Sequence, residues 1–242
     1  MSRPFRGLSD PQMTFLRPDI VLMEQSDPGA QDAKMFTNSY ALLKPGKALL
    51  LDLSSSTLIP FVRQLHSKGF SPVGVMISHR HVVDFDDSIG TIATEFKIPV
   101  LLHPIDAGHP RALGANILFE NPVDHPILRE FGIQTLFFPG HTEGHVIFYS
   151  PNQGGLLLTG DAAMGTTADQ AEEGLDRLIR PPIDFNVDDA KLREQWLAFD
   201  FNLPFSTVLP FHGTGYIDRR KEDLDTIMRT LIRREPTEGL LG

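Results

Sequence analysis

A short apolar strand that ends in two histidines constrains this chain more than any other stretch. Residues 73–77 read Val-Gly-Val-Met-Ile, and Ser78-His79-Arg80-His81 follows directly. In extended backbone, residues i and i+2 point to the same side, so the two imidazoles can converge on one point. Taken alone, such a pair is more often two surface histidines than a metal site, so other parts of the sequence must decide.

Apolar spacing in the first half of the chain predicts strands that alternate with helices. Apolar residues at i, i+3, i+4 and i+7 predict helices over 58–65 and 89–96. Ser56 or Thr57 can cap the first helix, and Asp86 or Asp87 the second. The expected strands are 20–24, 38–43, 48–53, 73–77 and 99–102.

The second half repeats this theme less regularly. Helices are expected around 192–199 and 224–232. The expected strands are 133–138, 146–149, 156–158 and 207–209. No low-complexity linker or domain boundary interrupts the pattern. We therefore expect residues 1–242 to form one α/β domain with two sheet halves and helices outside.

Composition excludes several classes of protein and of site. The net charge is −9, which argues against nucleic acid as a partner because nucleic acid favours a basic surface. The chain has no cysteine, so any metal must be bound by His, Asp or Glu. No stretch approaches the ~20 apolar residues of a membrane span, and no apolar run of a secretory signal follows the N-terminus. A cytoplasmic protein is the expectation.

Residues able to bind a metal follow four of the expected strands. They are His79 and His81, His141, Asp161 and His212. Functional sites of α/β folds collect at strand ends on one edge of the sheet, so these five side chains can meet at one place. This coincidence makes a metal site a much better explanation than a set of unrelated histidines.

Four segments, taken in order, resemble the metal motifs of the metallo-β-lactamase superfamily. They are His79-Arg80-His81, Pro139-Gly140-His141-Thr142-Glu143-Gly144-His145, Thr159-Gly160-Asp161 and Phe211-His212-Gly213. The second segment is the most specific and is similar to that of glyoxalase II-like members. The resemblance covers about residues 20–232. It implies a four-layer αβ/βα sandwich with the metal site in a shallow groove along one edge.

The resemblance also implies which residues bind metal. His79, His81 and His141 would form the first site, and Asp161 would bridge to, or face, a second site that includes His212. Three imidazoles with one open position suit catalytic zinc, which lowers the pKa of a bound water to about 7. We therefore expect one or two zinc ions, with iron and manganese as the alternatives.

The chain departs from the family after the second histidine. The family motif reads H-x-H-x-D-H, and its last two residues bind the second ion, but this chain reads His79-Arg80-His81-Val82-Val83-Asp84-Phe85. Without a gap, Val83 replaces the aspartate; with one inserted residue, Phe85 replaces the histidine. In both alignments Asp84 is the nearby carboxylate that remains, so we expect it to bind the second ion or to orient the attacking water.

Several other residues have a structural and a functional interpretation. Asp52 is either a support for the metal ligands, as the resemblance implies, or an acid at a helix N-terminus. His145 is expected to be structural, and His103 and His109 to be ordinary loop histidines. Trp196 is expected in the core.

The resemblance implies a metal-dependent hydrolase that uses a metal-bound hydroxide on a small ester or thioester-type substrate. The first alternative is a mononuclear non-haem iron oxygenase similar to persulfide dioxygenases, because His79, His141 and Asp161 supply two histidines and one carboxylate. The second alternative is a non-catalytic relative that binds a ligand. The expected partner is a small-molecule substrate, not nucleic acid or a membrane, and the oligomeric state is left open.

Overall fold

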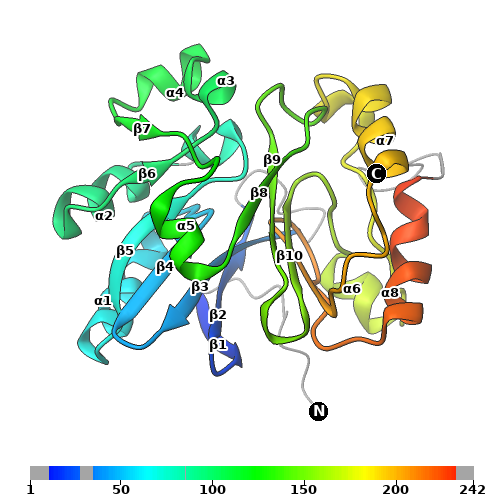
Figure 1. Ribbon diagram of the computed structural model, residues 1–242, viewed down its shortest axis with the longest axis horizontal. Coiled ribbons are helices and arrows are strands. Elements are labelled where there is room, and N and C mark those ends of the chain that lie inside the picture. Colours follow the sequence, from blue (N-terminus) through cyan, green and yellow to red (C-terminus); the bar gives the residue numbers. More distant parts are fainter. Residues whose placement is uncertain (1–10, 28–34, 85, 233–242) are drawn as a thin grey trace.

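Two β-sheets lie face to face, and helices cover the outer side of each (Figure 1). The computed structural model describes residues 11–27, 35–84 and 86–232. Within these residues, one sheet has seven strands in the order β1-β2-β3-β4-β5-β6-β7, and the other has four in the order β11-β10-β9-β8. The expected four-layer αβ/βα sandwich is confirmed.

The strands fall into antiparallel and parallel parts. The first sheet contains β1 (Gln12–Arg17), β2 (Ile20–Ser26), β3 (Phe36–Lys44), β4 (Lys47–Leu51), β5 (Ser71–Met76), β6 (Val100–Leu101) and β7 (Phe119–Glu120). The second contains β8 (Gln134–Phe137), β9 (Val146–Ser150), β10 (Leu156–Gly160) and β11 (Thr207–Pro210). Strands β1 to β4 pair antiparallel and β4 to β7 parallel, whereas β8 to β10 pair antiparallel and β10 pairs parallel with β11.

The helices are mostly short. The α-helices are α1 (Ile59–Ser67), α2 (Ser88–Phe96), α3 (Pro104–Ala107), α4 (Pro110–Gly114), α5 (Pro126–Phe131), α6 (Ala168–Glu172), α7 (Asp189–Ala198) and α8 (Lys221–Met228). The 3-10 helices are η1 (Ser56–Leu58), η2 (Arg80–Asp84), η3 (Asn152–Gly154), η4 (Ile183–Phe185) and η5 (Arg229–Leu231). No helix in the described part of the chain is long and apolar enough to span a membrane.

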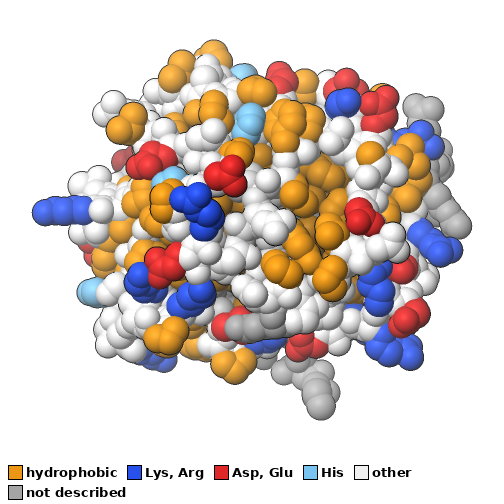
Figure 2. Space-filling view, in the orientation of Figure 1, with side chains coloured by type: hydrophobic (Ala, Val, Ile, Leu, Met, Phe, Trp, Pro, Cys, Tyr) orange, Lys and Arg blue, Asp and Glu red, His pale blue; other side chains and the backbone are white. Residues whose placement is uncertain are grey.

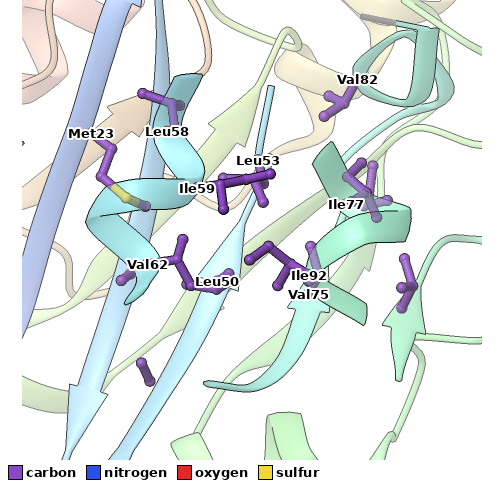
Figure 3. Close-up of a cluster of buried hydrophobic side chains, with 14 of the residues drawn as sticks. Met23, Leu50, Leu53, Leu58, Ile59, Val62, Val75, Ile77, Val82 and Ile92 are labelled. Atoms are coloured by element: carbon purple, nitrogen blue, oxygen red, sulfur yellow. The ribbon is translucent and has the colours of Figure 1, made fainter. Parts of the chain in front are cut away.

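Three buried apolar clusters account for the four layers. One joins α1 and α2 to the first sheet, including Leu50, Val62 and Ile92 (Figure 3). A second lies between the two sheets and includes Met76 and Phe148. A third joins the second sheet to α7 and α8 and contains the expected core residue Trp196. Figure 2 shows that hydrophobic side chains also reach the surface near the middle of one face, over the four-stranded sheet.

Alternation along β4 explains why its sequence is apolar without interruption. Leu50 packs toward the helices, whereas Leu49 and Leu51 pack toward the second sheet. Successive side chains of a strand point to opposite faces, so a strand covered on both faces needs apolar residues at every position. The strands that apolar spacing does not predict are β1, whose residues are half-buried or exposed, and the two-residue β7.

One expected helix cap is displaced by one residue, and the other lies at an expected position. Ser55, rather than Ser56 or Thr57, accepts a hydrogen bond from the Thr57 amide at the start of η1. Asp87 occupies the N-cap position of α2 without a side-chain bond. Asp86 instead accepts hydrogen bonds from the amides of Ser56 and Ser88, so one carboxylate ties the starts of two helices together.

Three His-Pro pairs begin short helices that apolar spacing does not predict. The Nδ1 atoms of His103, His109 and His125 accept hydrogen bonds from the amides two residues later, at 3.3–3.4 Å. Proline is well tolerated in the first turn, where its missing N–H is not needed. His103 and His109 are therefore helix caps, which agrees with their expected lack of a ligand role.

Truncating the helix-facing core should destabilise the protein. Leu50 is fully buried, and Leu-to-Ala changes at such sites cost about 2–5 kcal/mol. We expect Leu50→Ala to lower the free energy of unfolding by this amount in urea denaturation. Leu118→Ala is the control, because Leu118 is 89% exposed and its truncation should leave the free energy of unfolding nearly unchanged. Equal effects of the two substitutions would contradict the assigned core.

Candidate metal centre

Three histidines from two sheets converge at one edge of the sandwich. His79 and His81 follow β5, and His141 lies between β8 and β9. Each offers a ring nitrogen, and these atoms all lie within 4.8 Å of one another. His81 Nδ1 is 3.0 Å from His141 Nε2. The structure therefore brings together the three residues expected to form the first metal site.

The local backbone differs from the expected extended segment. Arg80–Asp84 forms the 3-10 helix η2, so His79 and His81 do not share one side of a strand. The rings instead stand at 90° with their centroids 5.2 Å apart. The convergence was predicted correctly, but its stated geometric reason was wrong, because the chain turns directly after the strand.

A chain of hydrogen bonds fixes the orientation of His79. Asp52 accepts hydrogen bonds from both the amide and the hydroxyl of Ser78, at 2.7 and 2.8 Å. The Ser78 hydroxyl donates its one proton to Asp52. Ser78 Oγ can therefore only accept a hydrogen bond from His79 Nδ1, which is 2.9 Å away. This assigns the proton to Nδ1 and leaves a lone pair on His79 Nε2. Asp52 thus orients His79 through Ser78, and its support of a metal ligand stays a prediction.

Asn186 fixes His141 in the same way. The Asn186 amide nitrogen donates to Pro181 O and to Asp189 Oδ1, at 3.1 and 3.0 Å. The Asn186 carbonyl oxygen must therefore face His141 Nδ1, 3.0 Å away, and it can only accept from it. The proton lies on Nδ1, and the lone pair of His141 Nε2 points into the cluster.

Asp161 adds an oxygen to this cluster. Its Oδ2 atom lies 3.4 Å from His79 Nε2 and 3.6 Å from His141 Nε2. Its other oxygen accepts a hydrogen bond from His212 Nδ1 at 2.7 Å. Burial by itself would raise the pKa of Asp161, but the adjacent His212 holds it well below its usual value. The carboxylate is therefore ionised at neutral pH.

This donor set fits a divalent cation. Burial lowers the pKa of His81 to about 2 and of His141 to about 4, so both rings are neutral at pH 7. His79 Nε2 is buried and makes no hydrogen bond to any described residue. The buried lone pair of His79 Nε2 faces the ionised Asp161 Oδ2 without a proton between them, which is costly, and a cation bound by imidazole and carboxylate removes that cost. His81 is the partly exposed member of the three, so the centre opens beside it.

His212 lies beside the centre, held between two carboxylates. Its Nδ1 faces Asp161, and its Nε2 lies 3.1 Å from Asp27 Oδ2. Burial by itself would lower the pKa of His212, but Asp161 and Asp27 together raise it to about 10. In this arrangement both ring nitrogens donate. Its role as a ligand of a second ion stays a prediction.

The side chain of Asp84 lies outside the described part of the structure, as does Phe85, so the role of Asp84 also stays a prediction.

His145 is fully buried and stacks on His79, with ring centroids 5.2 Å apart. The glycine before Asp161 helps to close this region, because a Cβ on Gly160 would lie 2.4 Å from Ser78 Oγ. His145 does not belong to the group formed by His79, His81 and His141, and its structural role stays a prediction.

Sequence reasoning missed four residues that shape the centre. They are Asp27, Ser78, Asp106 and Asn186. Asp27 directly follows β2 and Ser78 stands two residues after β5, and a polar residue just after a strand is a signal that could have been used for both. Asp106 lies on the short helix α3, which apolar spacing does not predict, and Asn186 lies in the irregular segment before α7, where no periodic pattern marks a functional position.

Removing the Asn186 amide should weaken metal binding. Partners that orient a ligating histidine are typically worth 10–100-fold in metal affinity. We expect Asn186→Ala to raise the Kd for Zn²⁺ by that factor in competition with a chromophoric chelator. Asn202→Ala is the control, because Asn202 is exposed and bonds only to Asp200 among described residues. An unchanged Kd in Asn186→Ala would show that this contact does not orient His141.

The sequence was compared with known proteins. No family model matches it. The "Probable metallo-hydrolase YqgX" of Bacillus subtilis (strain 168) is 26% identical over 142 residues, which is 51% of this chain and 64% of the relative. The match thus spans less than two thirds of the relative's length.

Solved structures match over a larger part of the chain. The metallo-β-lactamase FIM-1 from Pseudomonas aeruginosa in its mono-zinc form has a TM-score of 0.68 at 12% identity, covering 93% of this chain and 96% of its own. The DIM-1 metallo-β-lactamase has a TM-score of 0.63 at 13% identity, covering 91% and 98%. With its two-sheet sandwich, the chain has the metallo-β-lactamase fold, and its His79, His81 and His141 cluster lies at one edge of that sandwich.

Proposed function

We propose that this chain is a metal-dependent hydrolase that acts on a small ester or thioester-type substrate. The observation that carries the proposal is the meeting of three imidazole nitrogens and one carboxylate oxygen at an edge of the sandwich. The name of the Bacillus subtilis relative, a probable metallo-hydrolase, supports it. The mono-zinc form of FIM-1 supports zinc as the ion.

The residues of the centre would have three different roles. His79, His81 and His141 would hold the ion, and Asp52, Ser78 and Asn186 would keep two of those rings in the binding tautomer. A bound divalent ion would lower the pKa of a coordinated water to about 7 and would polarise a substrate carbonyl. Asp161 Oδ2 remains able to accept a hydrogen bond from water, because His212 occupies only Oδ1.

The surroundings of His141 favour a substrate with a small apolar part. The segment that carries Asn186 also carries Ile183, Phe185 and Val187, which are 52–56% exposed. The Val187 amide donates to His141 O at 3.2 Å, so this apolar segment is attached to the centre. Exposed apolar side chains next to a polar site are typical of ligand-binding surfaces. This supports an acyl ester or thioester over a highly charged substrate.

Metal removal and reloading test the proposed hydrolysis. We expect chelator-treated protein to lose turnover of p-nitrophenyl acetate or of a small acyl thioester, and added Zn²⁺ to restore it. His141→Ala should lose turnover even when reloaded, because a ligand is missing. Turnover that survives both metal removal and His141→Ala would contradict the proposal, and absence of turnover in metal-loaded protein across an acyl panel would favour a non-catalytic relative.

A mononuclear iron oxygenase is the second candidate function. It is favoured by Asp161 Oδ2, which faces both His79 and His141 and so completes a set of two histidines and one carboxylate. Protein purified without oxygen separates the two functions. Stoichiometric iron together with oxygen consumption on a persulfide substrate would displace the hydrolase, whereas zinc without oxygen consumption supports it.

Asp84 is proposed to bind a second ion or to orient the attacking water. If so, Asp84→Asn should lower kcat/KM by about 10²–10³, the usual cost of losing one positioned polar group, while one ion is retained. Asp87→Asn is the matched control, since Asp87 lies three residues later, is exposed and makes no side-chain capping bond. Equal, small effects of both changes would show that Asp84 has no part in turnover.

A further inference from the structure

We infer that Asp106 is the positioning residue that holds the two histidine-bearing loops together, so that His79, His81 and His141 can share one ion. Asp106 lies on the short helix α3 and is fully buried. The inference rests on the proposed metal-binding function, which it deepens by assigning a residue outside the ligand set.

The Asp106 carboxylate accepts four hydrogen bonds. Its Oδ1 accepts from Arg80 Nη1 and from the Gly144 amide, both at 2.9 Å. Its Oδ2 accepts from the Arg80 amide at 2.9 Å and from the Thr142 hydroxyl at 2.6 Å. None of the donors belongs to α3, so the carboxylate connects segments that are far apart in the sequence.

The donors lie next to the metal ligands on both sides of the centre. Arg80 stands between His79 and His81, in the loop after β5 of the first sheet. Thr142 directly follows His141 in the loop between β8 and β9 of the second sheet. Because both loops bond to the same two oxygens, a shift of one loop relative to the other breaks at least one of these hydrogen bonds.

Gly144 shows how closely the second loop packs on Asp106. A Cβ built on Gly144 would lie 2.5 Å from the Asp106 backbone nitrogen and 2.7 Å from its Oδ1. Any larger residue would push the loop away from α3. This gives a physical reason for glycine in the Thr142-Glu143-Gly144-His145 segment that is independent of the hydrogen bonds to the carboxylate.

Charge keeps Asp106 in this role and out of the ligand set. The guanidinium of Arg80, which is only 5% exposed, bonds to Asp106 and also to Glu143. A carboxylate whose two oxygens each accept two hydrogen bonds has its lone pairs occupied. Asparagine cannot replace it, because one oxygen would become an NH₂ donor that faces other donors.

Metal affinity and the spectrum of bound cobalt test the inference, without any assay of activity. We expect Asp106→Asn to raise the Kd for Zn²⁺ by about 10–100-fold, the usual range for residues that orient ligands, and to change the visible absorption spectrum of bound Co²⁺. Thr142→Val removes one of the four donors at nearly constant size and should change both readouts less, in the same direction. Circular dichroism verifies that each variant is folded.

Leu50→Ala is the control for general destabilisation, because Leu50 lies in the helix-facing apolar core. It should lower Tm and leave the Kd and the Co²⁺ spectrum unchanged. The inference is overturned if Asp106→Asn binds Zn²⁺ like the wild type, or if Leu50→Ala weakens binding as much at a similar Tm. If Asp106→Asn does not fold, Thr142→Val decides alone, and unchanged readouts overturn the inference. A wild-type protein that binds neither ion contradicts the proposed function itself.

Discussion

Buried lone pairs that face one another are the constraint on which this structure depends. Hydrogen bonds donated to Ser78 Oγ and Asn186 Oδ1 place the ring protons of His79 and His141 on the outer nitrogens, so the inner nitrogens carry lone pairs. An ionised carboxylate oxygen of Asp161 lies within 3.6 Å of both. Such a set is unfavourable in a dry interior unless a cation joins it, which is why the arrangement indicates metal binding more strongly than the presence of histidines does.

The sandwich explains how residues far apart in sequence reach that point. Each of the three clustered histidines follows a strand, and the two sheets present those strand ends at a shared edge. The apolar clusters on either side of each sheet hold the strands in place, and buried polar contacts connect the loops of the two sheets. Asp106 joins the loops that carry His81 and His141, and Asp161 joins His79 to His212. The apolar core thus sets the positions of the strand ends, and a few buried charged side chains set the positions of the clustered histidines.

Much of this could be predicted from the sequence because the signals are local. Strands such as β4 are buried on both faces and read as unbroken apolar runs, and His79, His81 and His141 stand directly after or between strands. The helices α3 to α5 could not be predicted from spacing, because they have four to six residues and are started by His-Pro caps. Asp106 and Asn186 act through contacts 26 to 45 residues away, and no periodic pattern records such contacts.

The central claim is that His79, His81 and His141 bind one ion next to Asp161. Anomalous diffraction at the zinc edge, from crystals of zinc-loaded protein, tests it most directly because it locates the ion without an assay or a known substrate. The account predicts an anomalous peak in contact with ring nitrogens of all three histidines and beside the Asp161 carboxylate. A peak elsewhere, or no peak in protein shown to be exposed to excess Zn²⁺, would contradict it.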